Sequence, residues 1–143
     1  MSSETTSPRA VSGPAGRIAV RRAAAVAGGV AAALALWALA GPVAGVAPTV
    51  RLDGAVRPVG PGAVAAASLL AGLAGWALLA LLERVLKRPG RTWTVIAVAV
   101  LVLSLPGPIT DAADIASAAI LTGMHLIVAA VLIPGLGGSG RGE

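Results

Sequence analysis

Residues 23–41 read AAAVAGGVAAALALWALAG and carry no charged side chain. A helix of about 20 apolar residues is long enough to cross a hydrocarbon core that is roughly 30 Å thick. Arg21 and Arg22 precede this run directly, and the next charged residue, Arg51, comes only after a segment rich in Gly and Pro. The stretch therefore predicts a transmembrane helix that begins after two arginines and ends near Gly41.

Three further apolar segments predict three more membrane helices, at about 62–82, 90–107 and 113–133. The third is the weakest, because its uninterrupted run of 14 residues, 92–105, reaches only ~21 Å at ~1.5 Å per residue. The helix must therefore start nearer Pro89, continue past Pro106, or thin the bilayer locally.

The ends of the last two helices are predicted from single residues. We expect Pro106-Gly107-Pro108 to turn the chain. Thr110 is a candidate N-cap for the fourth helix, with Asp111 and Asp114 in its first turn. Pro134 is expected to end that helix.

Composition supports a membrane protein and argues against several chemistries. Apolar residues make up 57% and charged residues 12% of the chain, against about 45–50% and about 25% in soluble domains. The sequence has no cysteine and a single histidine, so it predicts no disulfide, thiolate site or zinc centre. Phosphate-loop and H-E-x-x-H motifs are also absent. We expect no cofactor, no metal and no enzymatic activity.

A β-hairpin is predicted between the first two helices. Residues 50–57 alternate around Asp53-Gly54, a pair suited to the positive φ angles of a two-residue hairpin turn. The fold class expected is thus an all-α membrane protein, a four-helix transmembrane bundle with a short extracytoplasmic β-hairpin. The hairpin offers an outer contact loop of Arg51, Asp53 and Arg57.

Charge predicts the orientation of the chain. Nine basic residues fall on the side of the termini and the 84–91 loop, and only Arg51 and Arg57 fall on the other. Short loops rich in Lys and Arg stay in the cytoplasm, so both termini are expected inside. The loop also offers lipid head-group contacts at Arg84, Lys87, Arg88 and Arg91. Because basic residues cluster at helix ends, the net charge of +5 does not predict nucleic-acid binding.

Two tails are predicted to flank the membrane domain, which is expected over residues 17–136. Residues 1–16 and 137–143 are rich in Ser, Pro and Gly and lack apolar periodicity. The first span also has features of a secretory signal, since small residues at 44–47 offer a cleavage site.

A polar stripe on the fourth helix is the main candidate for chemistry. Helical spacing places Asp114, Thr122 and His125 on one face, where they could meet Ser104 of the third helix. A membrane-embedded histidine suggests a proton or substrate path. The alternative is a neutral His125 that bonds a carbonyl, or the hydroxyl of Ser68, Ser104 or Thr122, and so locks the bundle. No second buried acid or base accompanies it, which favours the structural role.

Small residues at four-residue spacing predict close helix packing, as at Gly29-x-x-x-Ala33, Ser68-x-x-x-Gly72, Ala71-x-x-x-Gly75 and Ala119-x-x-x-Gly123. These faces fit packing within one chain and homo-oligomerisation equally well. Trp37 and Trp93 lie near helix ends and are expected in the interfacial aromatic belt.

The chain resembles a family of small actinobacterial four-helix membrane proteins classed as a domain of unknown function. The resemblance rests on 103–108 (LSLPGP), 124–126 (MHL) and 132–136 (LIPGL), and it extends over roughly 21–136. It implies the same fold, and it carries no activity, cofactor or catalytic residue.

Two functions are therefore expected. The first is a non-enzymatic component of the bacterial plasma membrane that acts through the bilayer, a second copy or a membrane-protein partner. The second is a small proton-coupled transporter that uses the stripe of the fourth helix.

Overall fold

The computed structural model describes residues 13–138. It contains four helical segments long and apolar enough to cross a membrane, which confirms the four predicted helices. The elements in chain order are α1 (Pro14–Ala38), the π-helix η1 (Leu39–Val43), β1 (Thr49–Leu52), β2 (Ala55–Pro58), α2 (Pro61–Val85), α3 (Pro89–Ser104), α4 (Pro106–Asp111) and α5 (Ile115–Gly137).

Proline starts most of the helices. α1, α2 and α3 each have Pro at their first helical position, where the missing N–H has no helical partner to lose and the fixed φ suits a helix. α1 begins three residues earlier than the predicted start of the membrane domain. The rest of the predicted N-terminal tail, residues 1–12, lies outside the described residues, as do 139–143 of the C-terminal tail.

The expected turn at Pro106-Gly107-Pro108 is wrong. α3 and α4 are separated only by Leu105, which keeps helical angles of φ −61° and ψ −35°, and Pro106 serves as the first residue of the next helical segment. Together they form a single span of 23 residues, Pro89–Asp111, or ~34 Å at ~1.5 Å per residue. The third helix is thus long enough because it starts at Pro89 and continues past Pro106.

Two other helix boundaries also differ from prediction. Thr110 is not the N-cap of the last helix: it lies within α4, where its hydroxyl donates to the carbonyl of Pro106 at 2.9 Å. The N-cap is Asp114, whose carboxylate accepts from the backbone N–H of Ser117 at 2.8 Å. Pro134 lies inside α5, which continues to Gly137, as membrane helices often allow.

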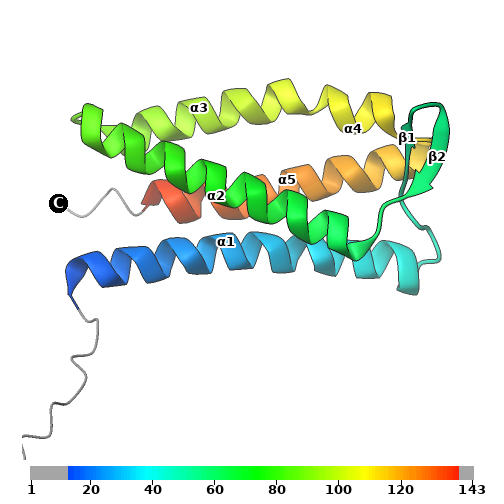
Figure 1. Cartoon of the computed structure of the whole chain (residues 1–143), viewed down its shortest axis with the longest axis horizontal. Helices are drawn as coiled ribbons and strands as arrows, with labels where there is room; N and C mark the ends of the chain where they lie inside the picture. Colours follow the sequence, from blue (N-terminus) through cyan, green and yellow to red (C-terminus); the bar gives the residue numbers. More distant parts are fainter. Residues whose placement is uncertain (1–12, 139–143) are drawn as a thin grey trace, which may run out of the picture.

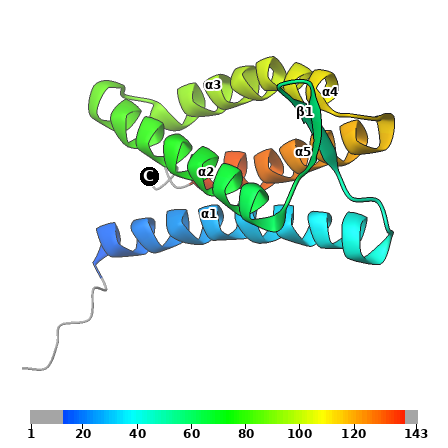
Figure 2. The same ribbon diagram turned by 45° about the vertical axis from the view of Figure 1, so that its right-hand side comes forward.

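α5 lies at the centre of the bundle and packs against α1, α2, α3 and α4. Figures 1 and 2 show that α2 runs obliquely, from beside α3 at their short connection to beside α1 at the hairpin end. The distance between α2 and α3 therefore widens toward the hairpin. Both ends of the described chain lie at the opposite end of the bundle, next to the α2–α3 connection.

The predicted hairpin is confirmed. β1 and β2 pair antiparallel, with Leu52 opposite Ala55, and the turn residues have positive φ angles of 51° at Asp53 and 79° at Gly54. The α4–α5 connection also pairs with β1, through a bridge between Val50 and Ala112. The backbone N–H of Ala113 donates to the carbonyl of Thr49 at 3.1 Å.

Small residues bring the helices together within this chain. A Cβ at Gly72 of α2 would lie 2.8 Å from a methyl carbon of Val26 in α1, and one at Gly29 would lie 3.5 Å from Leu132 in α5. Such close approach is how membrane helices gain packing contacts. At these positions, the small-residue faces are used inside the monomer.

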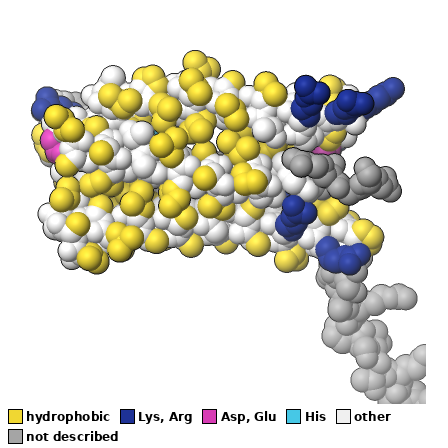
Figure 3. Space-filling view, turned by 180° about the vertical axis from the view of Figure 1, so that it is seen from behind, with side chains coloured by type: hydrophobic (Ala, Val, Ile, Leu, Met, Phe, Trp, Pro, Cys, Tyr) yellow, Lys and Arg dark blue, Asp and Glu magenta, His cyan; other side chains and the backbone are white. Residues whose placement is uncertain are grey.

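The described charged residues lie at the two ends of the bundle, and the face in Figure 3 shows no charged side chain between them. The end with the chain termini holds seven basic residues: Arg17, Arg21, Arg22, Arg84, Lys87, Arg88 and Arg91. We call this the basic end and the opposite one the hairpin end.

Candidate functional site

A cavity of about 690 Å³ lies between α2, α3 and α5. α2 contributes mostly small side chains to it, at Ala63, Ala67, Ala71 and Ala74. These residues leave unfilled the space that opens where α2 diverges from α3. The predicted small-residue face at Ala71-x-x-x-Gly75 therefore lines a cavity along part of its length.

The cavity follows much of the length of the bundle. Val50 and Val59 of the hairpin contribute to its lining at one end, and Trp93 and Ile133 lie toward the other. Ala67 and Val100, on facing walls, are both exposed, so the cavity is open along its side. None of the described residues that line it is charged.

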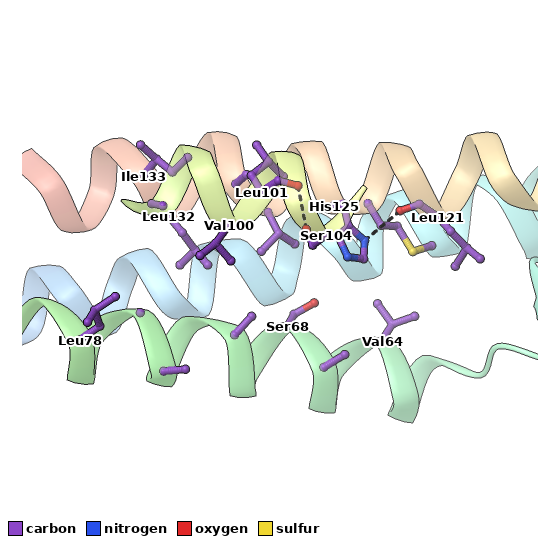
Figure 4. A pocket seen from close by; sticks show the side chains of 18 of the residues that line it. Val64, Ser68, Leu78, Val100, Leu101, Ser104, Leu121, His125, Leu132 and Ile133 are labelled. Atoms are coloured by element: carbon purple, nitrogen blue, oxygen red, sulfur yellow. Dashed lines mark hydrogen bonds between the residues drawn. The ribbon is translucent and has the colours of Figure 1, made fainter. Parts of the chain in front are cut away.

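Three polar side chains line the cavity, namely Ser68, Ser104 and His125. Figure 4 shows His125 and Ser104 on one side of the cavity and Ser68 on the other, with the hydroxyl of Ser68 directed into the space between them. Ser104 donates to the carbonyl of Leu101 in its own helix at 2.8 Å. Ser68 is only 8% exposed, and its hydroxyl has no hydrogen-bond partner among residues 13–138.

The contact of His125 fixes what its ring offers to the cavity. Nδ1 lies 3.3 Å from the carbonyl oxygen of Leu121, one turn earlier in α5. A carbonyl can only accept, so Nδ1 is the donor in this contact, and in the tautomer that carries its single proton on Nδ1 the lone pair of Nε2 is free. His125 thus presents a hydrogen-bond acceptor at Nε2.

The structure divides the predicted polar stripe. Ser104 and His125 share the cavity, whereas Thr122 and Asp114 do not line it. Asp114 instead holds the hairpin end together: it accepts from the hydroxyl of Ser117 at 2.9 Å and from that of Thr49 at 3.3 Å. The backbone N–H of Ser117 is the main cause of a pKa below the ordinary 3.8, and its hydroxyl adds to the effect.

The other predicted contact residues lie at the two ends. Arg51 donates to the carbonyl of Ala113 at 3.1 Å, so it is engaged within the chain, whereas Asp53 and Arg57 are exposed on the hairpin. The four basic residues of the other loop are also exposed, and they are Arg84, Lys87, Arg88 and Arg91.

Sequence reasoning missed an ion pair between α1 and α2. Arg22, only 6% exposed, donates to both carboxylate oxygens of Glu83, from Nη1 at 3.1 Å and from Nη2. The signal was present in the sequence, because both residues stand at the basic ends of consecutive antiparallel helices. Arg22 was instead counted only as an orientation charge.

Trp93 is not in the lipid-facing belt that its position suggested. It is 5% exposed, because its ring lies between α2 and α5: Cβ atoms at Gly75 and Gly137 would lie 2.8 and 3.2 Å from it. Its Nε1 has no hydrogen-bond partner within the described chain. Trp37 does have one, since its Nε1 donates to the carbonyl of Val59 at 2.7 Å.

The cavity can therefore surround a mostly apolar molecule and offer hydrogen bonds to a polar group on that molecule.

Among residues 13–138, no group of three or more potential metal-ligating side chains lies together. Comparisons with curated proteins and with solved structures find no match. A family model described as "Family of unknown function (DUF6069)" matches residues 13–142. The chain therefore belongs to this family.

Proposed function

We propose that this protein is a non-enzymatic component of the bacterial plasma membrane that holds an apolar molecule of the bilayer in the cavity between α2, α3 and α5. The observation that carries the proposal is the cavity itself. Its volume of about 690 Å³ falls within the 300–1,000 Å³ typical of ligand sites, which are mostly apolar with a few oriented polar groups.

The charge distribution supports an orientation with both termini in the cytoplasm. Seven basic residues gather at the basic end, against Arg51 and Arg57 at the other. Basic residues are retained on the cytoplasmic side during insertion. In this orientation the hairpin is extracytoplasmic, and the exposed basic loop is placed to contact anionic head groups.

A guest from the bilayer explains the cavity better than self-association through small residues. Gly29 and Gly72 already pack against neighbouring helices of the same chain. The cavity wall, in contrast, has few atoms opposite it, and side chains at a void lose dispersion contacts. An apolar guest entering at the open side restores those contacts.

Filling the cavity tests this function. Ala67→Leu adds three carbons to the cavity wall, whereas Ala66→Leu makes the same change at an exposed position that does not line the cavity. Both variants and the parent are extracted gently and examined by native mass spectrometry.

We expect the parent and Ala66→Leu to retain a stoichiometric lipid or other apolar molecule, and Ala67→Leu to retain only about half as much or less, which corresponds to a loss of affinity on the order of tenfold or more. Equal retention by both variants would contradict the proposal. A parent that carries a second copy of the chain and no small molecule would also contradict it and would favour self-association.

The second candidate function is a proton-coupled carrier, and the position of His125 at the cavity is the observation that favours it. In this function the ring takes up and releases a proton as a substrate passes. It predicts that His125→Leu abolishes proton flux into proteoliposomes while the protein stays folded. Equal flux from the parent, His125→Leu and protein-free vesicles would exclude it.

A further inference from the structure

Ser68 is a largely buried residue whose hydroxyl reaches the cavity and has no hydrogen-bond partner within the described chain. Ser68 is 8% exposed, has no hydrogen bond within residues 13–138, and directs its oxygen into the cavity (Figure 4). A serine in a membrane helix can usually bond the carbonyl four residues earlier. A hydroxyl that faces a mostly apolar cavity and makes no such bond is costly unless a molecule in the cavity supplies one. Ser68 therefore points to a polar atom on whatever occupies the cavity.

His125 faces the same cavity from the opposite wall, with Nε2 available as an acceptor because Nδ1 contacts the carbonyl of Leu121. Ser68 can donate and accept through its hydroxyl, while the neutral ring can only accept at Nε2. One group complements both: a hydroxyl, which accepts from Ser68 and donates to His125. A carbonyl oxygen could accept from Ser68 but could not donate to His125, and a hydrocarbon could form a hydrogen bond with neither side chain.

The depth of these side chains decides which lipid can present such a group. His125 lies ten residues after the start of α5 at Ile115, or ~15 Å along the helix at ~1.5 Å per residue. That is about half of a ~30 Å hydrocarbon core. A phospholipid keeps its phosphate at the interface, and a phosphate drawn to this depth would meet no cation, since no described lining residue is charged. The site therefore excludes charged head groups.

We propose that the cavity binds a neutral long-chain lipid alcohol, with its hydroxyl between Ser68 and His125 and its chain extending along the cavity toward Trp93. The inference rests on the proposed function and names the chemical class of the guest. The polar groups lie in the hairpin half of the cavity, and the part between Leu78 and Trp93 offers only apolar side chains. The uneven distribution of polar groups along the cavity sets the direction in which the hydrocarbon chain of the lipid alcohol extends.

The test compares two probes that differ by one oxygen, 1-hexadecanol and hexadecane. Binding of each radiolabelled probe to the delipidated full-length protein in detergent is measured by scintillation proximity. The parent is expected to bind the alcohol about tenfold more tightly, which corresponds to about 1.4 kcal/mol. Ser68→Ala and His125→Leu should each reduce this preference for the alcohol over hexadecane at least threefold.

Ser104→Ala is the matched control, because it removes a cavity-lining hydroxyl that already donates to Leu101, and it should keep the preference. Ser68→Ala removes a single oxygen, so it decides the test even where His125→Leu fails to fold. Equal binding of the two probes by the parent, or an unchanged preference in Ser68→Ala, would overturn this inference and leave the proposed function standing. Binding of neither probe would overturn both.

Discussion

Replacing Glu83 by Gln tests whether the ion pair with Arg22 holds α1 to α2 at the basic end. Arg22 is 6% exposed and lies 21 residues before the end of η1 at Val43, or ~31 Å along the helix. Because a hydrocarbon core is roughly 30 Å thick, Arg22 stands where the apolar region begins. Glu83→Gln keeps the shape of the side chain and replaces the countercharge by a neutral amide.

The exposure of the two partners sets the size of the effect. Removing one member of a fully buried pair costs about 3–5 kcal/mol, while an exposed pair contributes less than about 1 kcal/mol. The side chain of Arg22 is 7% exposed and that of Glu83 is 31% exposed, so the pair lies between these limits. We expect Glu83→Gln to lower the free energy of unfolding by about 1–2 kcal/mol. Arg22→Met should cost less, because the carboxylate of Glu83 can turn toward water.

A double-mutant cycle isolates the interaction between the two side chains. Unfolding of the parent, both single variants and the double variant is followed by circular dichroism in mixed micelles of increasing SDS content. The coupling free energy is expected to be about 1 kcal/mol, with Arg84→Met as a control for loss of an exposed charge. Additivity within about 0.3–0.5 kcal/mol, or a Glu83→Gln effect no larger than that of the control, would refute this reasoning.

Two further predictions concern packing and pH. Gly72→Val should lower the free energy of unfolding by about 1–3 kcal/mol, because a Cβ at this position would lie 2.8 Å from a methyl carbon of Val26. The control in the same unfolding assay is Gly62→Val, since a Cβ at Gly62 would have no neighbouring atom within 4 Å. The pKa of Asp114 is lowered from 3.8, so its contribution to stability is present above that pH and is lost as the pH falls through the lower value of the folded state. The thermal midpoint should therefore fall below about pH 4 and should fall less in Asp114→Asn; equal pH profiles would contradict the assignment.

The sequence predicts the helices and the hairpin because both depend on local patterns. Apolar length is a strong signal for a membrane helix, and Asp53-Gly54 is a strong signal for a two-residue turn. Proline, in contrast, does not predict by itself whether a helix ends, begins or continues at that residue. Pro106 and Pro134 were expected to end helices, but a proline also suits a first helical position and is tolerated in membrane helices. Only the path of the chain decides between these roles.

The cavity could not be predicted, because it depends on how α2 and α3 diverge. Helical spacing correctly drew attention to His125 and Ser104, which share the cavity. The same spacing added Asp114, which caps a helix. Ser68 lies on a different helix and was named only as a possible partner of His125, whereas in the structure its hydroxyl has no partner within the described chain. A face of small residues gives the same pattern whether a neighbouring helix or a cavity lies opposite.

The pairing of β1 with the α4–α5 connection has a mechanical consequence for the cavity. α2 is tied to α3 by the short connection of residues 86–88 at one end. At the other end α2 follows the hairpin, which pairs with Ala112 through the bridge at Val50. The residue after the hairpin, Val59, also accepts a hydrogen bond from Trp37 of α1. The two cavity walls, α2 and α3, are therefore held relative to each other at both ends of the bundle. We expect such bracing to keep the cavity open in the absence of the proposed guest, and a preorganised site loses little of its binding energy to reorganisation.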